Sequence, residues 1–147
     1  MVARMLEGRE MNPVPVSIHA EDERGNVLTL LAPLEIIWRG RIVSVPAGFE
    51  SDGVSTPRCL WATVSPAIHP QTLRAGIAHD YIYRTQPDDW TRAEADALFY
   101  DLARDDGFGW FRAQKAYWGL RLFGGAAWRD NAKRLQNNLK RTGNISK

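Results

Sequence analysis

The spacing of the apolar residues changes along this chain of 147 residues, and that change limits the folds open to it. From Val14 to Val45 the apolar residues form short runs separated by turn residues, which is typical of strands. After Thr72 they recur every three or four residues, which is typical of helices. Strands that precede helices favour an α+β fold over an alternating α/β fold. We therefore expect a small N-terminal antiparallel β-sheet followed by a cluster of about four helices.

Four short segments have the composition of strands. They are Val14–Ile18, Val27–Leu31, Leu34–Trp38 and Arg41–Val45. The last two are predicted to pair as a hairpin, because Arg39-Gly40 between them tolerates the positive φ angles of a tight turn. Pro46 has no backbone N–H to donate, so the second strand should end before it.

The helical half of the chain is divided by its capping and glycine residues. Thr91 and Glu94 have the spacing of a capping box and should open the second helix, which Gly107-Phe108-Gly109 should end. The pair Gly124-Gly125 is expected to break or bend the helical segment that follows. The predicted helices are Thr72–Arg84, a helix from Thr91, Trp110–Phe123 with Phe111, Trp118 and Leu122 on one side, and Ala126–Leu139.

Composition is consistent with one domain. The chain is 44% hydrophobic and 24% charged, which is ordinary for a globular protein large enough to bury its own core. We expect a single domain over residues 1–147, made of an N-terminal arm (1–12), strands (13–45), a site loop (46–70), helices (71–141) and a frayed tail (142–147). Cys59 is the only cysteine, which excludes an internal disulfide and favours a reducing compartment. The N-terminus lacks the apolar core of a signal peptide, and no segment has the length and apolarity of a membrane span.

Charge is distributed unevenly along the chain. The net charge is only +2, but residues 1–110 hold 10 basic and 16 acidic residues, whereas residues 111–147 hold 9 basic and 1 acidic. The two segments therefore carry −6 and +8, which indicates a basic interaction surface near the C-terminus. A partner protein docking on the basic C-terminal helix is the first interpretation. An anionic membrane surface is another, and nucleic acid is not expected because no known reader motif is present.

The proline-rich and glycine-rich segment 46–70 holds the first group of candidate site residues. Asp52, Ser55 and Arg58 would be displayed from one rigid turn around Asp52-Gly53 and Thr56-Pro57. One interpretation is structural, with Ser55 bonded to the backbone and Arg58 paired with Asp52. The other is a ligand loop, with Ser55 and Arg58 contacting substrate and Asp52 binding a divalent cation through hard oxygen ligands.

A second group lies on the first predicted helix. His79, Asp80 and Tyr83 are three and four residues apart, so their side chains can converge on one surface. A histidine beside a carboxylate suits general-base catalysis or metal binding. The alternative is a buried histidine that is hydrogen-bonded for structural reasons only.

Asp96 on the second predicted helix is the remaining candidate. If the first two helices pack antiparallel, Asp96 can approach His79 and orient its ring. Equally, Asp96 can be a solvated residue that pairs with Arg92 one turn earlier. The sequence leaves both interpretations open.

The order of these motifs resembles the phage and prophage family known as domain of unknown function 1353. The resemblance covers Leu31 to Trp128, with departures at Ser51 and at Val54-Ser55-Thr56. It implies a phage or prophage origin and assigns no activity. The residues that carry it are Val45-Pro46-Ala47-Gly48-Phe49, Ser51-Asp52-Gly53, Ser55, Pro57-Arg58, Ala78-His79-Asp80-Tyr81, Tyr83-Arg84, Ala95-Asp96, Phe99, Arg121 and Phe123-Gly124.

The run His79-Asp80-Tyr81-Ile82-Tyr83 is also similar to the His-Asp-x-x-Tyr catalytic helix of secreted phospholipases A2. That likeness implies His79 as the base that activates water and Asp80 as a calcium ligand, with Tyr83 and Asp96 steadying the histidine. The chain lacks that family's disulfides and glycine-rich calcium loop, a role that Asp52 would have to fill.

Two functional hypotheses follow. The first is a cation-assisted hydrolase acting on an ester or amide of the bacterial envelope, with calcium, magnesium or zinc held by Asp52 and Asp80. The second is a non-enzymatic virion component, for tail or assembly, whose His-Asp-Arg cluster is structural and whose basic C-terminal helix binds another phage protein. Either protein would be found in the cytoplasm of the infected or lysogenic bacterium, or in the virion.

Overall fold

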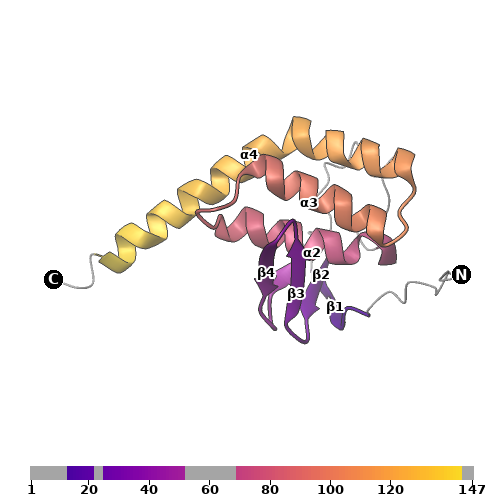
Figure 1. The fold of residues 1–147 in the computed structure, drawn as a ribbon. Coiled ribbons are helices and arrows are strands. Elements are labelled where there is room, and N and C mark those ends of the chain that lie inside the picture. Colours follow the sequence, from indigo (N-terminus) through magenta and orange to yellow (C-terminus); the bar gives the residue numbers. More distant parts are fainter. Residues whose placement is uncertain (1–12, 22–24, 52–68, 144–147) are drawn as a thin grey trace, which may run out of the picture.

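The computed structural model describes residues 13–21, 25–51 and 69–143. These residues form five strands and three helices, which confirms the α+β class (Figure 1). The elements are β1 (Val16–Glu21), β2 (Gly25–Leu30), β3 (Leu34–Trp38), β4 (Arg41–Val45), β5 (Glu50–Ser51), α2 (Pro70–Thr85), α3 (Arg92–Asp105) and α4 (Trp110–Gly143).

The strands form two small antiparallel sheets. One has the order β1-β2-β5, and the other is the β3–β4 hairpin. Both hairpin strands have the predicted bounds, with Leu34 opposite Val45 and Trp38 opposite Arg41. Arg39 and Gly40 have φ angles of 48° and 78°, the left-handed conformation that the turn requires. β5 lies within the predicted site loop of residues 46–70, where Glu50 and Ser51 form a short strand that pairs with β2.

The first two helices begin at side-chain caps. His69 accepts a hydrogen bond from the Gln71 backbone at the start of α2. At α3 the predicted capping box is present, with Thr91 accepting from the Glu94 N–H and Glu94 accepting from the Thr91 N–H. The helices form successive layers over the strands: α2 lies next to them, α3 packs on α2, and α4 covers α3 (Figure 1).

The third and fourth predicted helices are one helix. α4 runs without interruption from Trp110 to Gly143, so the expected break at Gly124-Gly125 is wrong. The helix axis does change direction along its length, which agrees with the alternative of a bend (Figure 1). A glycine inside a helix costs only about 1 kcal/mol, which neighbouring contacts can offset. Gly124 is needed for another reason: a Cβ there would lie 2.6 Å from the hydroxyl oxygen of Tyr83 on α2. The helix also includes residues 142 and 143, which were expected to fray.

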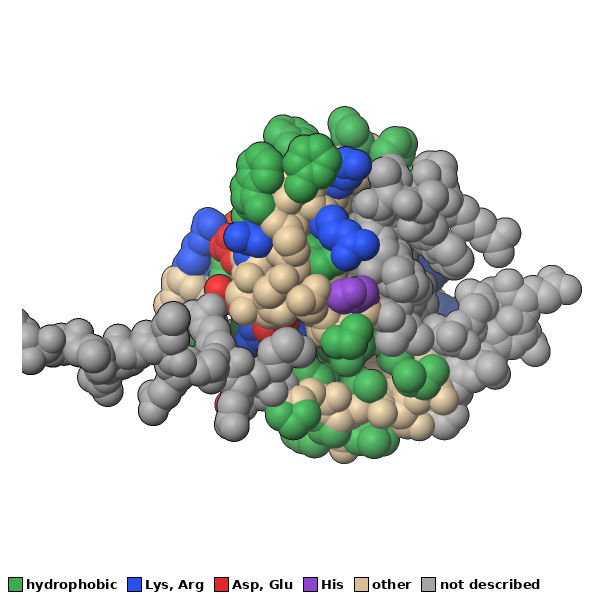
Figure 2. Space-filling view, turned by 90° about the vertical axis from the view of Figure 1, so that its right-hand side faces the viewer, with side chains coloured by type: hydrophobic (Ala, Val, Ile, Leu, Met, Phe, Trp, Pro, Cys, Tyr) green, Lys and Arg blue, Asp and Glu red, His purple; other side chains and the backbone are tan. Residues whose placement is uncertain are grey.

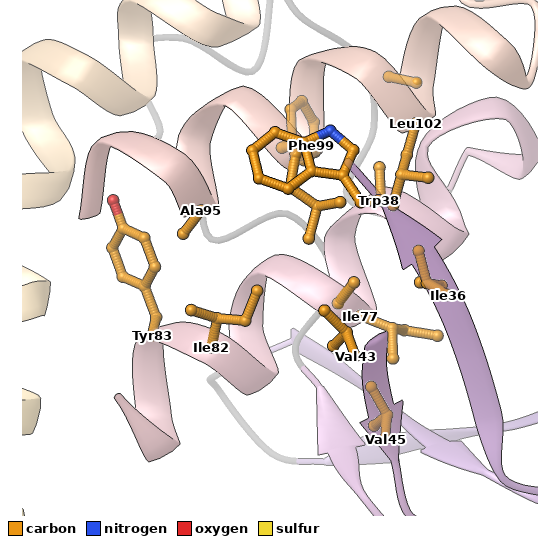
Figure 3. Close-up of a cluster of buried hydrophobic side chains, with 14 of the residues drawn as sticks. Ile36, Trp38, Val43, Val45, Ile77, Ile82, Tyr83, Ala95, Phe99 and Leu102 are labelled. Carbon is orange, nitrogen blue, oxygen red and sulfur yellow. The ribbon is translucent and has the colours of Figure 1, made fainter. Parts of the chain in front are cut away.

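The hydrophobic core lies between the hairpin and the helices. Ile36, Trp38, Val43 and Val45 alternate with exposed residues along β3 and β4, and they face Ile77 of α2 (Figure 3). Trp38 also donates from Nε1 to an Asp101 carboxylate oxygen at 2.8 Å, which joins β3 to α3. The core thus fixes α2 against α3, the two helices that carry the candidate site.

Candidate active site

Helix α2 holds His79 and Tyr83 one turn apart with their rings in contact. The ring centroids are 4.1 Å apart at an interplanar angle of 33°, and Phe99 of α3 meets the His79 ring edge-on at 5.8 Å. The His79 side chain is 8% exposed. The prediction that His79, Asp80 and Tyr83 converge on one surface therefore holds for His79 and Tyr83 but not for Asp80, which is bonded to Ser51. The histidine is held between aromatic rings.

Asp96 of α3 lies at the centre of the site and is fully buried. Its Oδ1 atom accepts hydrogen bonds from His79 Nε2 at 2.9 Å and from the Tyr83 hydroxyl at 2.6 Å. Its Oδ2 atom accepts from Arg121 Nη1 of α4 at 2.9 Å, and Arg92 Nη1 lies 3.5 Å away. The prediction that Asp96 approaches His79 is confirmed. The expected pairing with Arg92 also exists, but a solvated Asp96 is wrong because the antiparallel packing of α2 and α3 encloses it (Figure 1).

These contacts decide the charge of Asp96. Burial by itself raises the pKa of a carboxyl, but the hydrogen bonds from His79, Tyr83 and Arg121 outweigh it and hold the pKa of Asp96 below its usual value. Burial and the hydrogen bond to Asp96 raise the pKa of Tyr83 well above its usual value. At neutral pH the site therefore combines an ionised Asp96 with a protonated Tyr83 hydroxyl.

The charge of Asp96 in turn determines the tautomer of His79. An ionised carboxylate only accepts hydrogen bonds, so His79 Nε2 must carry the proton that is donated to Asp96. In the neutral ring the lone pair is then on Nδ1. No described residue forms a hydrogen bond with Nδ1. The arrangement can therefore accept a proton at Nδ1 while Asp96 stabilises the imidazolium that results.

Asp80 takes part in a different contact. Its Oδ2 atom accepts a 2.5 Å hydrogen bond from the Ser51 hydroxyl, and both side chains are buried. The next turn of α2 is tied to the same strand, since Arg84 Nη1 donates to the Glu50 carbonyl at 2.6 Å. Asp80 thus faces β5, whereas Asp96 binds His79.

Two residues of the site were missed by sequence reasoning. In the sequence, Ser51 and Arg121 stand out only through the family resemblance, with no role in the site assigned to either. A signal existed for Arg121, because it is the only charged residue between Ala116 and Trp128. A lone charge in an apolar helical stretch indicates a buried ionic partner, which here is Asp96.

Three predicted site residues, Asp52, Ser55 and Arg58, lie outside the described residues. Within the described ranges, no group of three or more His, Cys, Asp or Glu side chains could hold a metal ion. Of the two predicted cation ligands, only Asp80 can be placed, and it is bonded to Ser51.

Comparison with known proteins identifies the family. A family model described as a protein of unknown function (DUF1353) matches residues 28–120. The chain belongs to this family. The DUF1353 match includes His79, Asp80, Tyr83 and Asp96 and ends one residue before Arg121. No curated protein and no solved structure matches the chain.

Proposed function

We propose that this protein is a hydrolase of esters or amides in which His79 is the general base. Support comes from one observation above all: His79 Nε2 is bonded to the buried, ionised Asp96, which directs the ring's lone pair to Nδ1. The Tyr83 hydroxyl donates to the same Asp96 oxygen that accepts from His79, and this second hydrogen bond helps to fix the carboxylate against the His79 ring. Such an oriented His-Asp pair is a recurring means of activating water.

The proposed reaction requires one proton shuttle. His79 Nδ1 removes a proton from water as the water oxygen attacks the carbonyl carbon of the substrate. The carbon–oxygen or carbon–nitrogen bond to the leaving group then breaks, and the leaving group takes the proton from the ring. Asp96 stays ionised throughout and is a positioning residue. The phage origin implied by the family resemblance directs the search for substrates to the bacterial envelope.

The test compares the same substitution at two histidines. His79→Asn should lower hydrolysis of a chromogenic 4-nitrophenyl ester by at least about a hundredfold, since general-base catalysis contributes about that much or more. His69→Asn is the matched control, because asparagine is also a good N-cap for α2 and should leave the rate unchanged. Both variants should keep the wild-type circular dichroism spectrum. Unchanged activity in His79→Asn, or no hydrolysis by the wild type of any ester or amide tried, would refute the proposal.

Cation assistance is a separate part of the proposal, with Asp80 and Asp52 as ligands. Calcium, magnesium or zinc should raise the midpoint of thermal unfolding, because a ligand that binds only the native state stabilises it. Asp80→Asn should abolish that rise, measured against the metal-free midpoint of the variant itself because Asp80 is buried and bonded to Ser51. A midpoint that none of the three ions moves would contradict the metal part and leave the His79 part standing.

A virion or assembly component is the second candidate. It is favoured by the fact that Asp96 joins three helices, as a purely structural residue would. The distal part of α4 would then be the docking element, since it extends past the other helices and carries Lys133 and Arg134 on exposed positions (Figure 1). Reversing both charges should abolish binding to a phage partner while the fold is retained. In this case His79→Asn would lower stability and no hydrolysis would be found.

A further inference from the structure

The outer face of the N-terminal half of α4 carries a row of exposed apolar side chains. Phe111, Trp118 and Leu122 are 65%, 58% and 72% exposed. Their spacing of seven and four residues places them on one side of the helix, opposite the buried Ala113 and Ala116. Figure 2 shows hydrophobic side chains gathered over this part of α4 at the top of the face it draws. We call Phe111, Trp118 and Leu122 the α4 stripe.

The side chains of the α4 stripe are not needed to pack α4 against α3. The helix already packs on α3 through its small residues, and Tyr117 meets Tyr100 of α3 with ring centroids 5.9 Å apart. Trp110, which is 57% exposed, adds to this apolar surface, because its ring lies 6.1 Å from that of Phe111 between centroids. Single exposed apolar residues are common in soluble proteins, but a contiguous group on one helix marks an interaction surface.

The charged residues around the α4 stripe indicate what kind of surface it binds. Residues 110–129 contain four basic residues and no acidic one. Lys115 and Arg129 are exposed and share the face of the stripe by helical spacing, and Lys115 Nζ lies 5.0 Å from the centre of the Phe111 ring. A second copy of this face would bring like charges together, which opposes self-association through it. Exposed apolar side chains with basic side chains among them fit a binding surface that has negatively charged groups on the outside and an apolar layer below them.

We propose that the N-terminal half of α4 lies along the surface of an anionic lipid bilayer. Trp118, Phe111 and Leu122 enter the boundary between headgroups and acyl chains, while Lys115 and Arg129 pair with lipid phosphates. The helix axis is parallel to the membrane plane. In the described part of the chain, none of the helices has the length and apolarity to cross a bilayer. This surface does not depend on the proposed hydrolase activity.

Co-sedimentation with lipid vesicles tests the proposal. The full-length protein should pellet with vesicles of phosphatidylglycerol and phosphatidylcholine, and much less with phosphatidylcholine alone or at high salt. Trp118→Gln and Leu122→Gln should each weaken partitioning about tenfold or more, since each removes a large apolar side chain from the buried face. Glutamine keeps the helix propensity, and circular dichroism checks the fold. Ile37→Thr is the matched control, because Ile37 is 78% exposed on β3, away from α4, and should leave partitioning unchanged.

Four results would overturn the proposal. They are no pelleting of the wild type, equal pelleting with charged and neutral vesicles, unchanged partitioning of both glutamine variants, and equal loss in Ile37→Thr. Sedimentation velocity and a DNA retention assay cover the other occupants. Dimerisation that Trp118→Gln abolishes would assign the α4 stripe to a second copy of the chain, and DNA binding that the same variant abolishes would assign it to nucleic acid.

Discussion

Adding one methyl group at Gly124 should destabilise the protein, whereas the same change at the adjacent Gly125 should not. A Cβ atom at Gly124 would lie 2.6 Å from the Tyr83 hydroxyl oxygen, a separation at which atoms must move. At Gly125 the nearest atom would be Arg129 Nη1 at 3.3 Å, the end of a flexible side chain. Tyr83 cannot move aside freely, because its hydroxyl is bonded to Asp96 and its ring packs edge-on against Trp128 at 5.0 Å.

The two variants together isolate the cost of that contact. Replacing glycine by alanine inside a helix gains about 1 kcal/mol at either position. Overpacking at Gly124 costs about 1–3 kcal/mol, and the gain in helix propensity cancels when the two variants are compared. We therefore expect Gly124→Ala to have a free energy of unfolding about 1–3 kcal/mol lower than that of Gly125→Ala.

Urea unfolding followed by circular dichroism measures the difference. Repeating it with Tyr83→Phe removes the hydroxyl, after which the nearest ring carbons lie 3.5 Å from the added methyl group, an ordinary contact. The penalty at Gly124 should then disappear. Equal stability of Gly124→Ala and Gly125→Ala, or a penalty that persists without the hydroxyl, would refute this account of the helix.

Two further predictions concern α3. Asp96→Asn should lower the free energy of unfolding by about 3–5 kcal/mol, because buried donors lose their ionised acceptor, whereas Asp101→Asn at a partly exposed position should cost about 1 kcal/mol or less. Because folding lowers the pKa of Asp96, the stability it contributes is complete above about pH 4, its unfolded value, and is lost as the pH falls through the lower folded pKa. Acid unfolding should therefore be shallower in Asp96→Asn, and an unchanged acid profile would contradict the assignment. Thr91→Ala should cost about 1 kcal/mol of unfolding free energy through the lost capping box, and Thr91→Ser should restore it.

Local sequence patterns predicted the secondary-structure elements that are determined by residues close together in the sequence. The β3–β4 hairpin has the predicted bounds because apolar alternation and the Arg39-Gly40 turn both act within a few residues. The start of α3 follows from the capping box for the same reason. The continuity of α4 could not be predicted, because the role of Gly124 depends on Tyr83, which is distant in sequence. Spacing alone also could not tell which side of α4 is buried, since apolar residues occupy both.

The candidate site was predictable in part. His79 and Tyr83 share a helical turn, so their contact follows from spacing once α2 forms. The contact of Asp96 with His79 depends on how α3 packs on α2, which residue spacing within one helix does not determine. Arg121 and Ser51 contribute through long-range contacts to Asp96 and Asp80, which no local pattern encodes.

The hydrogen bonds of Asp96 have a consequence for the local unfolding of the three helices. One carboxylate accepts hydrogen bonds from α2 and α4 while it belongs to α3, so displacing any one of these helices leaves the others with an unmatched buried charge. Arg92 strengthens the link by donating to the Leu120 and Arg121 carbonyls of α4. The three helices around the site therefore open as one cooperative unit. Among the described residues, the bond from Gln86 to the Trp128 carbonyl is the last that ties α4 to another element, so beyond it the helix can unwind without exposing the site.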